Sequence, residues 1–160
     1  GFNLIISDTV GFIQKLPTTL IAAFKSTLEE AKDADLLLHV VDSSHPEYKT
    51  QYDTVNRIIG DLDMGQIPQA ILFNKKDLHS GEIPTSSHPN VFVSSKQQDD
   101  IEKVKSLLQQ QIKKILTYYE ETVNSADADH LYYLKQHTLV TELTFDETEE
   151  VYKVQGYRKE

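Results

Sequence analysis

The sequence has no cysteine among its 160 residues. A disulfide framework, a thiolate nucleophile and a thiolate metal site are therefore excluded, and a reducing compartment is compatible with the composition. No segment approaches the roughly 18 consecutive apolar residues that a membrane-spanning helix needs. No signal peptide is recognisable, so we expect a cytoplasmic protein without a membrane span.

Glycine is also sparse, and positive charges are fewer than negative ones. None of the six glycines begins the pattern GxxxxGK[ST], which forms a phosphate-cradling P-loop. The six histidines occur singly, without the spacing of a metal site. The net charge is −9 and the sequence pI is near 5.1, so the chain does not supply the clustered Lys and Arg of a long nucleic-acid footprint.

The residues that are present suit a globular domain of ordinary composition, with 39% hydrophobic and 26% charged residues. The length is enough for one sizeable core and a small appendage. The first residue is Gly1 and an apolar strand is expected at once, which is typical of a piece cut from a longer protein.

Segments of strand type and helix type alternate along most of the chain. Short apolar runs predict strands, and apolar residues repeated every three or four positions predict helices. The predicted strands are 3–8, 36–42, 69–73 and 91–94, and the predicted helices are 17–35, 46–62 and 99–115. The run at 36–42 is nearly continuous, as in a strand that is buried on both faces. The alternation indicates an α/β fold, with a mostly parallel sheet flanked by helices.

The composition shifts near residue 118, where we place a domain boundary. We expect a GTPase-like first domain at 1–117 and a small α+β domain at 118–160. Residues 118–129 are polar and acidic, so we interpret them as a linker or a helix extension. Residues 130–137 predict a short helix, and residues 138–145 and 151–157 predict a β-hairpin across the acidic turn at 146–150.

The first strand runs directly into the motif Asp8-Thr9-Val10-Gly11. A carboxylate at a strand end can hold Mg²⁺ through water, and the backbone N–H of Gly11 can approach a terminal phosphate because no side chain is in the way. Such a DxxG pattern also occurs by chance, and a strand-ending aspartate is often a cap or a turn residue. On its own the motif is weak support for a phosphate site.

Two further motifs follow later strands. In Asn74-Lys75-Lys76-Asp77, the Asp77 carboxylate can accept from the two neighbouring N–H donors that guanine presents and adenine does not. Asn74 can brace the base and an adjoining loop, and the stem of Lys75 can cover the flat base. In Ser94-Ser95-Lys96, a backbone N–H can bond the guanine oxygen while Lys96 shields the other side of the base.

Each of these motifs also has a plainer interpretation. The lysine-rich motif could be a solvated basic turn, and the serine-lysine tripeptide alone carries almost no information. Their order is more informative, because each motif follows an apolar strand and the carboxyl ends of parallel strands meet at one edge of a sheet. We therefore predict that Asp8, Asn74, Asp77 and Ser94 lie at one edge.

The sequence resembles a known family. The three motifs match the later nucleotide motifs of Ras-like GTPases. The stretches DTVGFIQKLP and TLIAAFKSTLEEAKDADLLLHVVDSSHP resemble the HflX family of ribosome-associated GTPases, closely over 4–46 and loosely beyond 117. The resemblance implies a partial Ras-like P-loop GTPase domain, with its first strands missing, followed by a small C-terminal domain.

The resemblance also implies a function for the intact parent. The implied parent is a cytoplasmic enzyme that binds GTP or GDP and hydrolyses GTP with Mg²⁺. It is also implied to associate with the large ribosomal subunit and to help split or rescue stalled ribosomes. Gly11 and Phe12 take the catalytic positions and Asp8 the metal position, although Phe12 stands where Ras-like enzymes place a water-orienting glutamine. The alternatives are another ribosome-assembly GTPase of the Ras-like kind, or a non-catalytic α/β interaction module.

The missing P-loop leads to two expectations. In the Ras-like topology its strand separates the Asp8 strand from the 36–42 strand, so we expect these two to pair directly or another chain to fill the gap. The fragment could therefore self-associate. We also expect the 160-residue chain to bind GTP weakly or not at all and to be inactive, because it keeps base-recognition residues and lacks the phosphate loop.

Overall fold

The structure is a computed structural model that describes residues 4–9, 26 and 28–160. The chain divides into two compact units. The described residues between Asp8 and Gln111 belong to the larger unit, and residues 112–160 belong to the smaller unit together with residues 4–7. None of the helices in the described ranges is both long and apolar enough to cross a bilayer.

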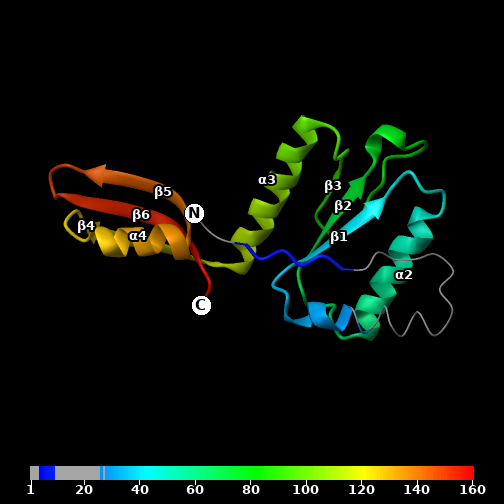
Figure 1. Cartoon of the computed structure of the whole chain (residues 1–160), viewed down its shortest axis with the longest axis horizontal. Coiled ribbons are helices and arrows are strands. Elements are labelled where there is room, and N and C mark those ends of the chain that lie inside the picture. The colour runs from blue at the N-terminus through cyan, green and yellow to red at the C-terminus, as the bar shows by residue number, and fades with distance from the viewer. Residues whose placement is uncertain (1–3, 10–25, 27) are drawn as a thin grey trace. The chain divides into compact units, whose positions relative to one another are not determined.

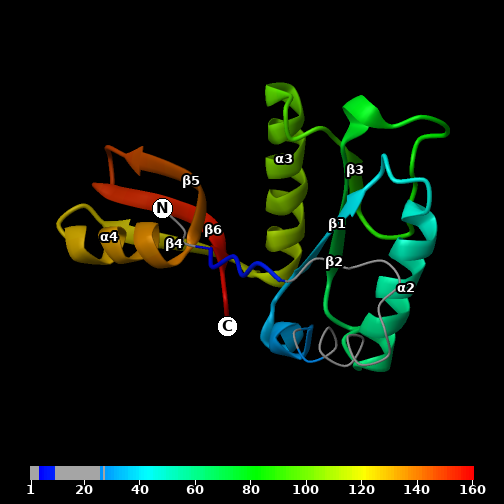
Figure 2. The ribbon, with the colours of Figure 1, turned by 45° about the vertical axis from the view of Figure 1, so that its right-hand side comes forward.

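A three-stranded parallel sheet organises the larger unit. Its strands are β1 (Leu37–Asp42), β2 (Gln69–Asn74) and β3 (Asn90–Phe92), in the order β1-β2-β3 (Figure 1). Helices α2 (Tyr48–Asp61) and α3 (Gln98–Ile115) lie on opposite faces of this sheet (Figure 2). Two short 3₁₀ helices, η1 (Glu30–Asp33) and η2 (Lys76–Leu78), also belong to this unit. The predicted α/β fold with a parallel sheet between helices is confirmed.

The core of the larger unit lies on both sides of β2. Side chains of α2 cover one face of the sheet and side chains of α3 cover the other, which is why β2 is buried along its length up to Asn74. The α2 face is formed by Val41, Ile71 and Phe73 with Tyr48 and Tyr52 against them. The α3 face is formed by Ala70, Leu72 and Leu107, with Leu36, Val91 and Val104 against them.

The predicted strand at 3–8 is wrong for the residues that the structure describes. Residues 4–9 belong to no strand, and Ile5 and Ile6 are 96% and 83% exposed. An apolar run becomes a strand only where a neighbour pairs its backbone groups, and none of the strands in the described part of the chain, β1 included, does so here. The expected direct pairing of this segment with 36–42 is therefore also wrong.

The strand at 36–42 differs from its prediction on one face. Val41 is buried, but Leu38 and Val40 are 38% and 56% exposed. Residues 10–25 and 27 lie outside the described residues, and with them lie the predicted site residues Gly11 and Phe12 and most of the predicted helix 17–35. The end of that helix is described, because Ser26, Leu28 and Glu29 are helical.

His39 of β1 is a histidine held in its neutral form. Its Nδ1 atom is buried without a hydrogen-bond partner among the described residues, and its ring stacks on Tyr52 with 5.3 Å between centroids. Burial, and to a lesser extent the charge of His88, lowers the pKa of His39 to about 4. Protonation therefore favours the unfolded chain, and the stabilisation is lost as the pH falls from the unfolded value near 6.5 toward 4.

We expect His39 to remove about 2 kcal/mol from the free energy of unfolding between pH 6.5 and pH 5. The variant His39→Phe keeps a ring against Tyr52 and cannot titrate, so its stability should depend less on pH over this window. Urea titrations followed by circular dichroism at pH 5, 6 and 7 measure the difference. Parallel curves for wild type and His39→Phe would contradict the prediction.

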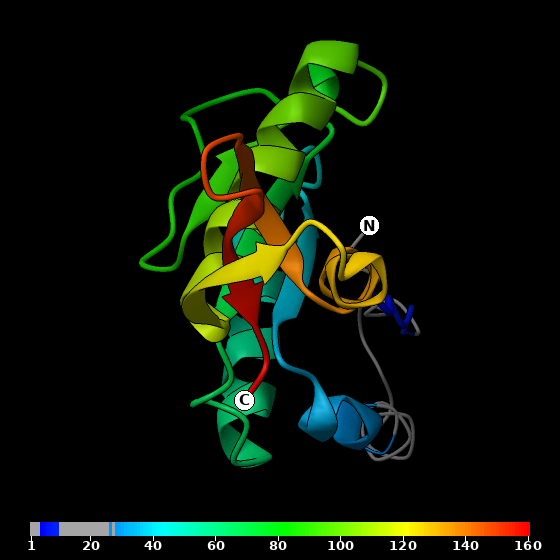
Figure 3. The same ribbon diagram turned by 90° about the vertical axis from the view of Figure 1, so that its left-hand side faces the viewer.

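The smaller unit is a three-stranded antiparallel sheet with one helix. Its strands are β4 (Thr117–Asn124), β5 (Leu139–Asp146) and β6 (Val151–Arg158), in the order β4-β6-β5. Helix α4 (Ala128–His137) connects β4 to β5 and packs on one face of the sheet (Figure 3). The buried cluster there consists of Tyr119, Val123, Leu134 and Val154. The predicted helix at 130–137 and the hairpin across 146–150 are confirmed.

The interpretation of residues 118–129 as a linker or helix extension is wrong, since most of them form β4. The segment alternates, with Tyr119 and Val123 buried on one side and Tyr118, Glu120 and Thr122 exposed on the other. Its acidic residues suggested solvent exposure. They are tolerated in a strand because an antiparallel sheet can pack one face on the core and keep the other in water. Asp127 then starts α4, where its carboxylate accepts the backbone N–H of His130 at 3.1 Å.

Gly156 of β6 lies in close contact with the residues around it. A Cβ atom there would lie 2.6 Å from the carbonyl oxygen of Leu139 and 3.0 Å from Cε1 of Tyr119. The ring of Tyr119 cannot easily withdraw, because its hydroxyl is hydrogen-bonded to Thr138 Oγ1 at 2.6 Å. The position therefore requires a residue without a side chain.

We expect Gly156→Ala to destabilise the smaller unit by about 1–3 kcal/mol, since overpacking a tight site displaces its neighbours. The control is Gly60→Ala in α2, where no atom of the described residues lies within 4 Å of the added Cβ. That change should stabilise the larger unit by roughly 0.5–1 kcal/mol, because alanine favours helix over glycine. Amide hydrogen exchange in each unit measures both effects, and equal signs for the two substitutions would rule out the packing argument.

Candidate functional site

Two loops at the carboxyl edge of the parallel sheet hold most of the predicted site residues. The NKKD loop (residues 74–77) begins at the last residue of β2, and the SSK loop (residues 94–96) follows β3 after Val93. Asp42, the last residue of β1, lies opposite Asn74 in the strand register. The predicted convergence of Asn74, Asp77 and Ser94 at one edge agrees with this placement. The prediction that Asp8 ends a further strand at this edge is wrong, because residues 4–9 belong to no strand.

Asn74 connects the two loops and the end of β1. Its side-chain Oδ1 accepts the backbone N–H of Ser95 at 3.1 Å. Its backbone oxygen accepts both the N–H of Ser43 at 3.1 Å and the Ser43 hydroxyl at 2.6 Å. Asn74 therefore braces an adjoining loop, as the sequence suggested.

Asp77 presents a carboxylate that is fixed on one side and open on the other. Its Oδ1 accepts the Ser94 hydroxyl at 2.7 Å, and its Oδ2 lies 3.5 Å from Nζ of Lys96, whose side chain is 75% exposed. The hydrogen bond from Ser94 is the main cause that holds the pKa of Asp77 below its usual range. The carboxylate is thus a partly exposed anionic acceptor whose Oδ2 is paired, among the described residues, with the exposed ammonium of Lys96.

Lys75 adopts a backbone conformation that is uncommon outside glycine. Its φ is 62°, in the left-handed region, which turns the chain sharply between β2 and η2. Its ammonium pairs with Asp42 Oδ2 at 2.7 Å, and Asp42 Oδ1 accepts the hydroxyl of Ser44 at 2.6 Å. The side chain is therefore held across the sheet edge, where its aliphatic stem can cover a flat ligand.

Three residues of this network were not predicted from the sequence. Lys76 and the carboxylate of Asp100 form an ion pair, and Asp100 Oδ2 also accepts the backbone N–H of Ser94 at 2.9 Å. The ring of His79 links Ser43 and Glu82 through their carbonyl oxygens, at 2.6 Å and 2.8 Å. The second lysine of the NKKD loop was a possible signal, but nothing in the sequence pattern singled out Asp100 or His79.

Asp8 is exposed, and no hydrogen bond or ion pair joins it to the described residues of the NKKD or SSK loops. No three histidine or acidic side chains of the described residues gather as a cation site. A single exposed carboxylate nevertheless fits a nucleotide-bound Mg²⁺, which protein sites hold with one or two carboxylates besides water and phosphate oxygens.

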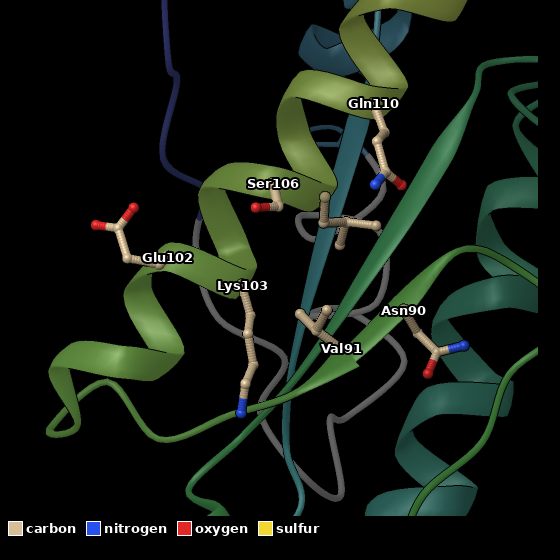
Figure 4. A pocket seen from close by; sticks show the side chains of 7 residues that line it. Asn90, Val91, Glu102, Lys103, Ser106 and Gln110 are labelled. Carbon is tan, nitrogen blue, oxygen red and sulfur yellow. The ribbon is translucent and has the colours of Figure 1, made fainter.

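A concave region lies between β3 and α3 (Figure 4). Val91 and Leu107 give it an apolar floor, and polar side chains of α3 such as Ser106 and Gln110 form its rim. None of the predicted site residues lines this groove, so the sheet edge described above is the better candidate for a nucleotide base.

Comparison with known proteins shows which proteins this chain is similar to. No protein-family model matches the chain. GTPase HflX of Alkalihalophilus pseudofirmus is 40% identical over 161 residues, which cover 100% of this chain and 38% of that protein. GTPase HflX of Caldanaerobacter subterraneus is 35% identical over 153 residues, which cover 92% of this chain and 34% of that protein. The chain therefore spans little more than a third of the length of these relatives.

A shorter match and a solved structure agree with this result. GTPase HflX of Flavobacterium psychrophilum is 52% identical over 75 residues, which cover 47% of this chain and 18% of that protein. The crystal structure of a mutation variant of SsGBP superposes with a TM-score of 0.56 and 24% sequence identity, over 68% of this chain and 42% of that chain. The structural likeness supports the α/β fold.

Proposed function

Since the chain belongs to the HflX family of GTPases, we propose that its NKKD and SSK loops recognise the guanine base of GTP and GDP. The observation that carries this proposal is the Asp77 carboxylate, which Ser94 fixes through Oδ1 while Oδ2 lies 3.5 Å from Nζ of the exposed Lys96. Guanine offers an N1–H and a 2-amino group as neighbouring donors, and a carboxylate can accept both. Adenine has no such pair of donors on that edge.

The neighbouring groups then complete the base site. The incoming base replaces the Lys96 ammonium as the partner of the Asp77 carboxylate. The aliphatic stem of Lys96 then covers one face of the base, and the stem of Lys75 covers the other. Within the SSK loop the Ser95 N–H is bonded to Asn74, whereas the Lys96 N–H reaches Ser94 Oγ at the long distance of 3.3 Å. The Lys96 N–H is therefore the donor most open to the guanine oxygen.

We propose that the complete gene product hydrolyses GTP to GDP and phosphate. Asp8 would be the protein ligand of a magnesium ion, and when bound this ion neutralises charge on the phosphate oxygens. Gly11 would approach the terminal phosphate through its N–H, with Phe12 beside it. The 160-residue sequence contains no GxxxxGK[ST] pattern, so we propose that this chain alone binds nucleotide weakly or not at all and does not hydrolyse it.

Family membership is the support for one further proposal. We propose that the complete gene product associates with the large ribosomal subunit and acts in splitting or rescuing stalled ribosomes. Co-sedimentation with purified large subunits, with a non-hydrolysable GTP analogue and then with GDP, tests this step. Binding that does not depend on the nucleotide would argue against a GTPase-controlled role.

Calorimetric titration with GTP, GDP and ATP tests the nucleotide proposal. The complete gene product should bind the guanine nucleotides and not ATP, and should release phosphate from GTP when Mg²⁺ is present. The 160-residue chain should show little heat with any of them. Equal binding of ATP and GTP by the complete gene product would refute guanine recognition, and micromolar GTP binding by the short chain would refute its proposed weakness.

A further inference from the structure

Asp100 is a buried carboxylate that joins the two loops of the proposed base site. It lies in the first turn of α3 and is only 1% exposed. Its Oδ2 accepts the backbone N–H of Ser94 at 2.9 Å and pairs with the ammonium of Lys76. Its Oδ1 pairs with the ammonium of Lys103 at 2.7 Å. One side chain therefore holds a residue of the NKKD loop, the first residue of the SSK loop and its own helix.

The connection continues from Asp100 to the proposed base-binding carboxylate. Asp100 fixes the backbone of Ser94, and Ser94, itself 1% exposed, donates its hydroxyl to Asp77. On the other side, Lys76 is bound to Asp100 through its ammonium and to the Val93 oxygen through its N–H at 3.0 Å. Asp77, the residue after Lys76, is thus held from both directions.

We propose that Asp100 is a positioning residue for guanine recognition: its buried charge sets the Ser94 hydroxyl and the Lys76 backbone so that Asp77 faces the base. The proposal rests on the proposed function, because it concerns how the same base site discriminates. Asp100 does not touch the nucleotide. It acts through Ser94 and Lys76, both of which its carboxylate contacts directly.

The charged groups around Asp100 favour a carboxylate that stays ionised and keeps its partners. Hydrogen bonds from Lys103, then from Lys76 and the Ser94 backbone, hold the pKa of Asp100 far below its usual range. The carboxylate therefore stays charged at neutral pH. A buried charge with several charge-assisted hydrogen bonds resists rearrangement, because removing one partner leaves the others uncompensated. Lys76 is the inner partner, at 28% side-chain exposure against 55% for Lys103.

The test compares GDP with inosine diphosphate, which lacks the 2-amino group that Asp77 would accept. In the complete gene product, Asp100→Asn should lower the preference for GDP over inosine diphosphate by about tenfold, as expected for one weakened hydrogen bond to a charged group. Its affinity for inosine diphosphate should change much less. In the nucleotide-free protein, amide exchange of Ser94 should accelerate by about tenfold or more, since its acceptor has lost its charge.

Two further variants keep the test decisive. Lys76→Gln removes only the partner on the NKKD loop and leaves Asp100 paired with Lys103, so it should also reduce the preference if Asp100→Asn fails to fold. Asp99→Asn is the matched control, because it removes an exposed carboxylate from the same turn of α3. It should leave both the nucleotide preference and the exchange of Ser94 unchanged.

The outcomes separate this proposal from the proposed function. Equal losses of affinity for GDP and inosine diphosphate would show a merely structural role for Asp100, and an unchanged preference in folded Asp100→Asn and Lys76→Gln would also overturn the proposal. A wild-type protein with no preference for GDP would contradict the proposed function and with it any part of Asp100 in base recognition. Amide exchange of Ser94 would then still decide whether Asp100 holds the loop.

Discussion

Replacement of Asp77 by asparagine should lower the affinity of the complete gene product for GDP by about 100-fold or more, since two hydrogen bonds to a charged group, of about 1.5–3 kcal/mol each, are disturbed. An asparagine side chain offers one acceptor and one NH₂ donor. One of the two guanine donors would therefore face another donor. The hydroxyl of Ser94 can still bond the remaining oxygen, so the loop itself should stay in place.

The same substitution should reverse the preference between two related bases. Xanthine carries a carbonyl oxygen where guanine carries its 2-amino group, so the asparagine NH₂ can donate to it while the amide oxygen accepts from N1–H. Asp77→Asn should therefore bind xanthosine diphosphate more tightly than GDP, whereas the wild type prefers GDP. This gain distinguishes altered recognition from simple damage, which lowers both affinities.

Calorimetric titration of both nucleotides into wild type and variant provides the measurement. Asp99→Asn is again a suitable control, because it also replaces one carboxylate by an amide but is exposed on α3. It should keep the wild-type order of affinities. If Asp77→Asn retained the wild-type ratio of GDP to xanthosine diphosphate, Asp77 would not be the base-recognition residue.

The arrangement of the larger unit could be predicted because its signals are local and strong. Residues 36–42 and 69–73 are short apolar runs, and the helix between them repeats its apolar residues at helical spacing. Once two such strands are joined by a helix, they are parallel, and their carboxyl ends share an edge. The approach of Asn74 to Ser95 follows from that topology, even though the residues lie far apart in sequence.

The errors arose where a segment depends on its neighbours. Ile5 and Ile6 look like a strand, yet an apolar run needs a pairing partner, and these residues are exposed. Residues 118–124 look like an acidic linker, yet the pairing of β4 with β6 makes them a strand whose Tyr119 and Val123 fill the core. In both segments tertiary context overrode composition.

The role of Asp100 could not be predicted for a different reason. The sequence places Lys75 and Lys76 side by side, and spacing alone does not tell which lysine turns inward. The left-handed conformation of Lys75 decides it, since Lys75 then reaches Asp42 while Lys76 reaches the buried Asp100. The packed loop sets this backbone conformation. A sequence rarely predicts it at a lysine, because a positive φ is uncommon outside glycine.

Phe73 connects the stability of the larger unit to its site. It is 1% exposed, it packs between Val41 and Ile71, and the rings of Tyr48 and Tyr52 lie 6.4 Å and 6.0 Å from its own. The next residue is Asn74, which anchors Ser43 and Ser95. A change in packing at Phe73 therefore acts on both the core and the first residue of the NKKD loop.

We expect Phe73→Ala to lower the free energy of unfolding by about 3–5 kcal/mol, because it removes a buried ring and leaves a cavity. Since domains of this size are stable by only about 5–15 kcal/mol, a large part of the molecules could unfold. Urea titration followed by circular dichroism measures the loss. Phe145→Ala deletes the same ring at a position 48% exposed in β5, and it should cost much less. Similar losses for the two variants would mean that Phe73 is not a central packing residue, and guanine recognition would then have to be stabilised from the loops alone.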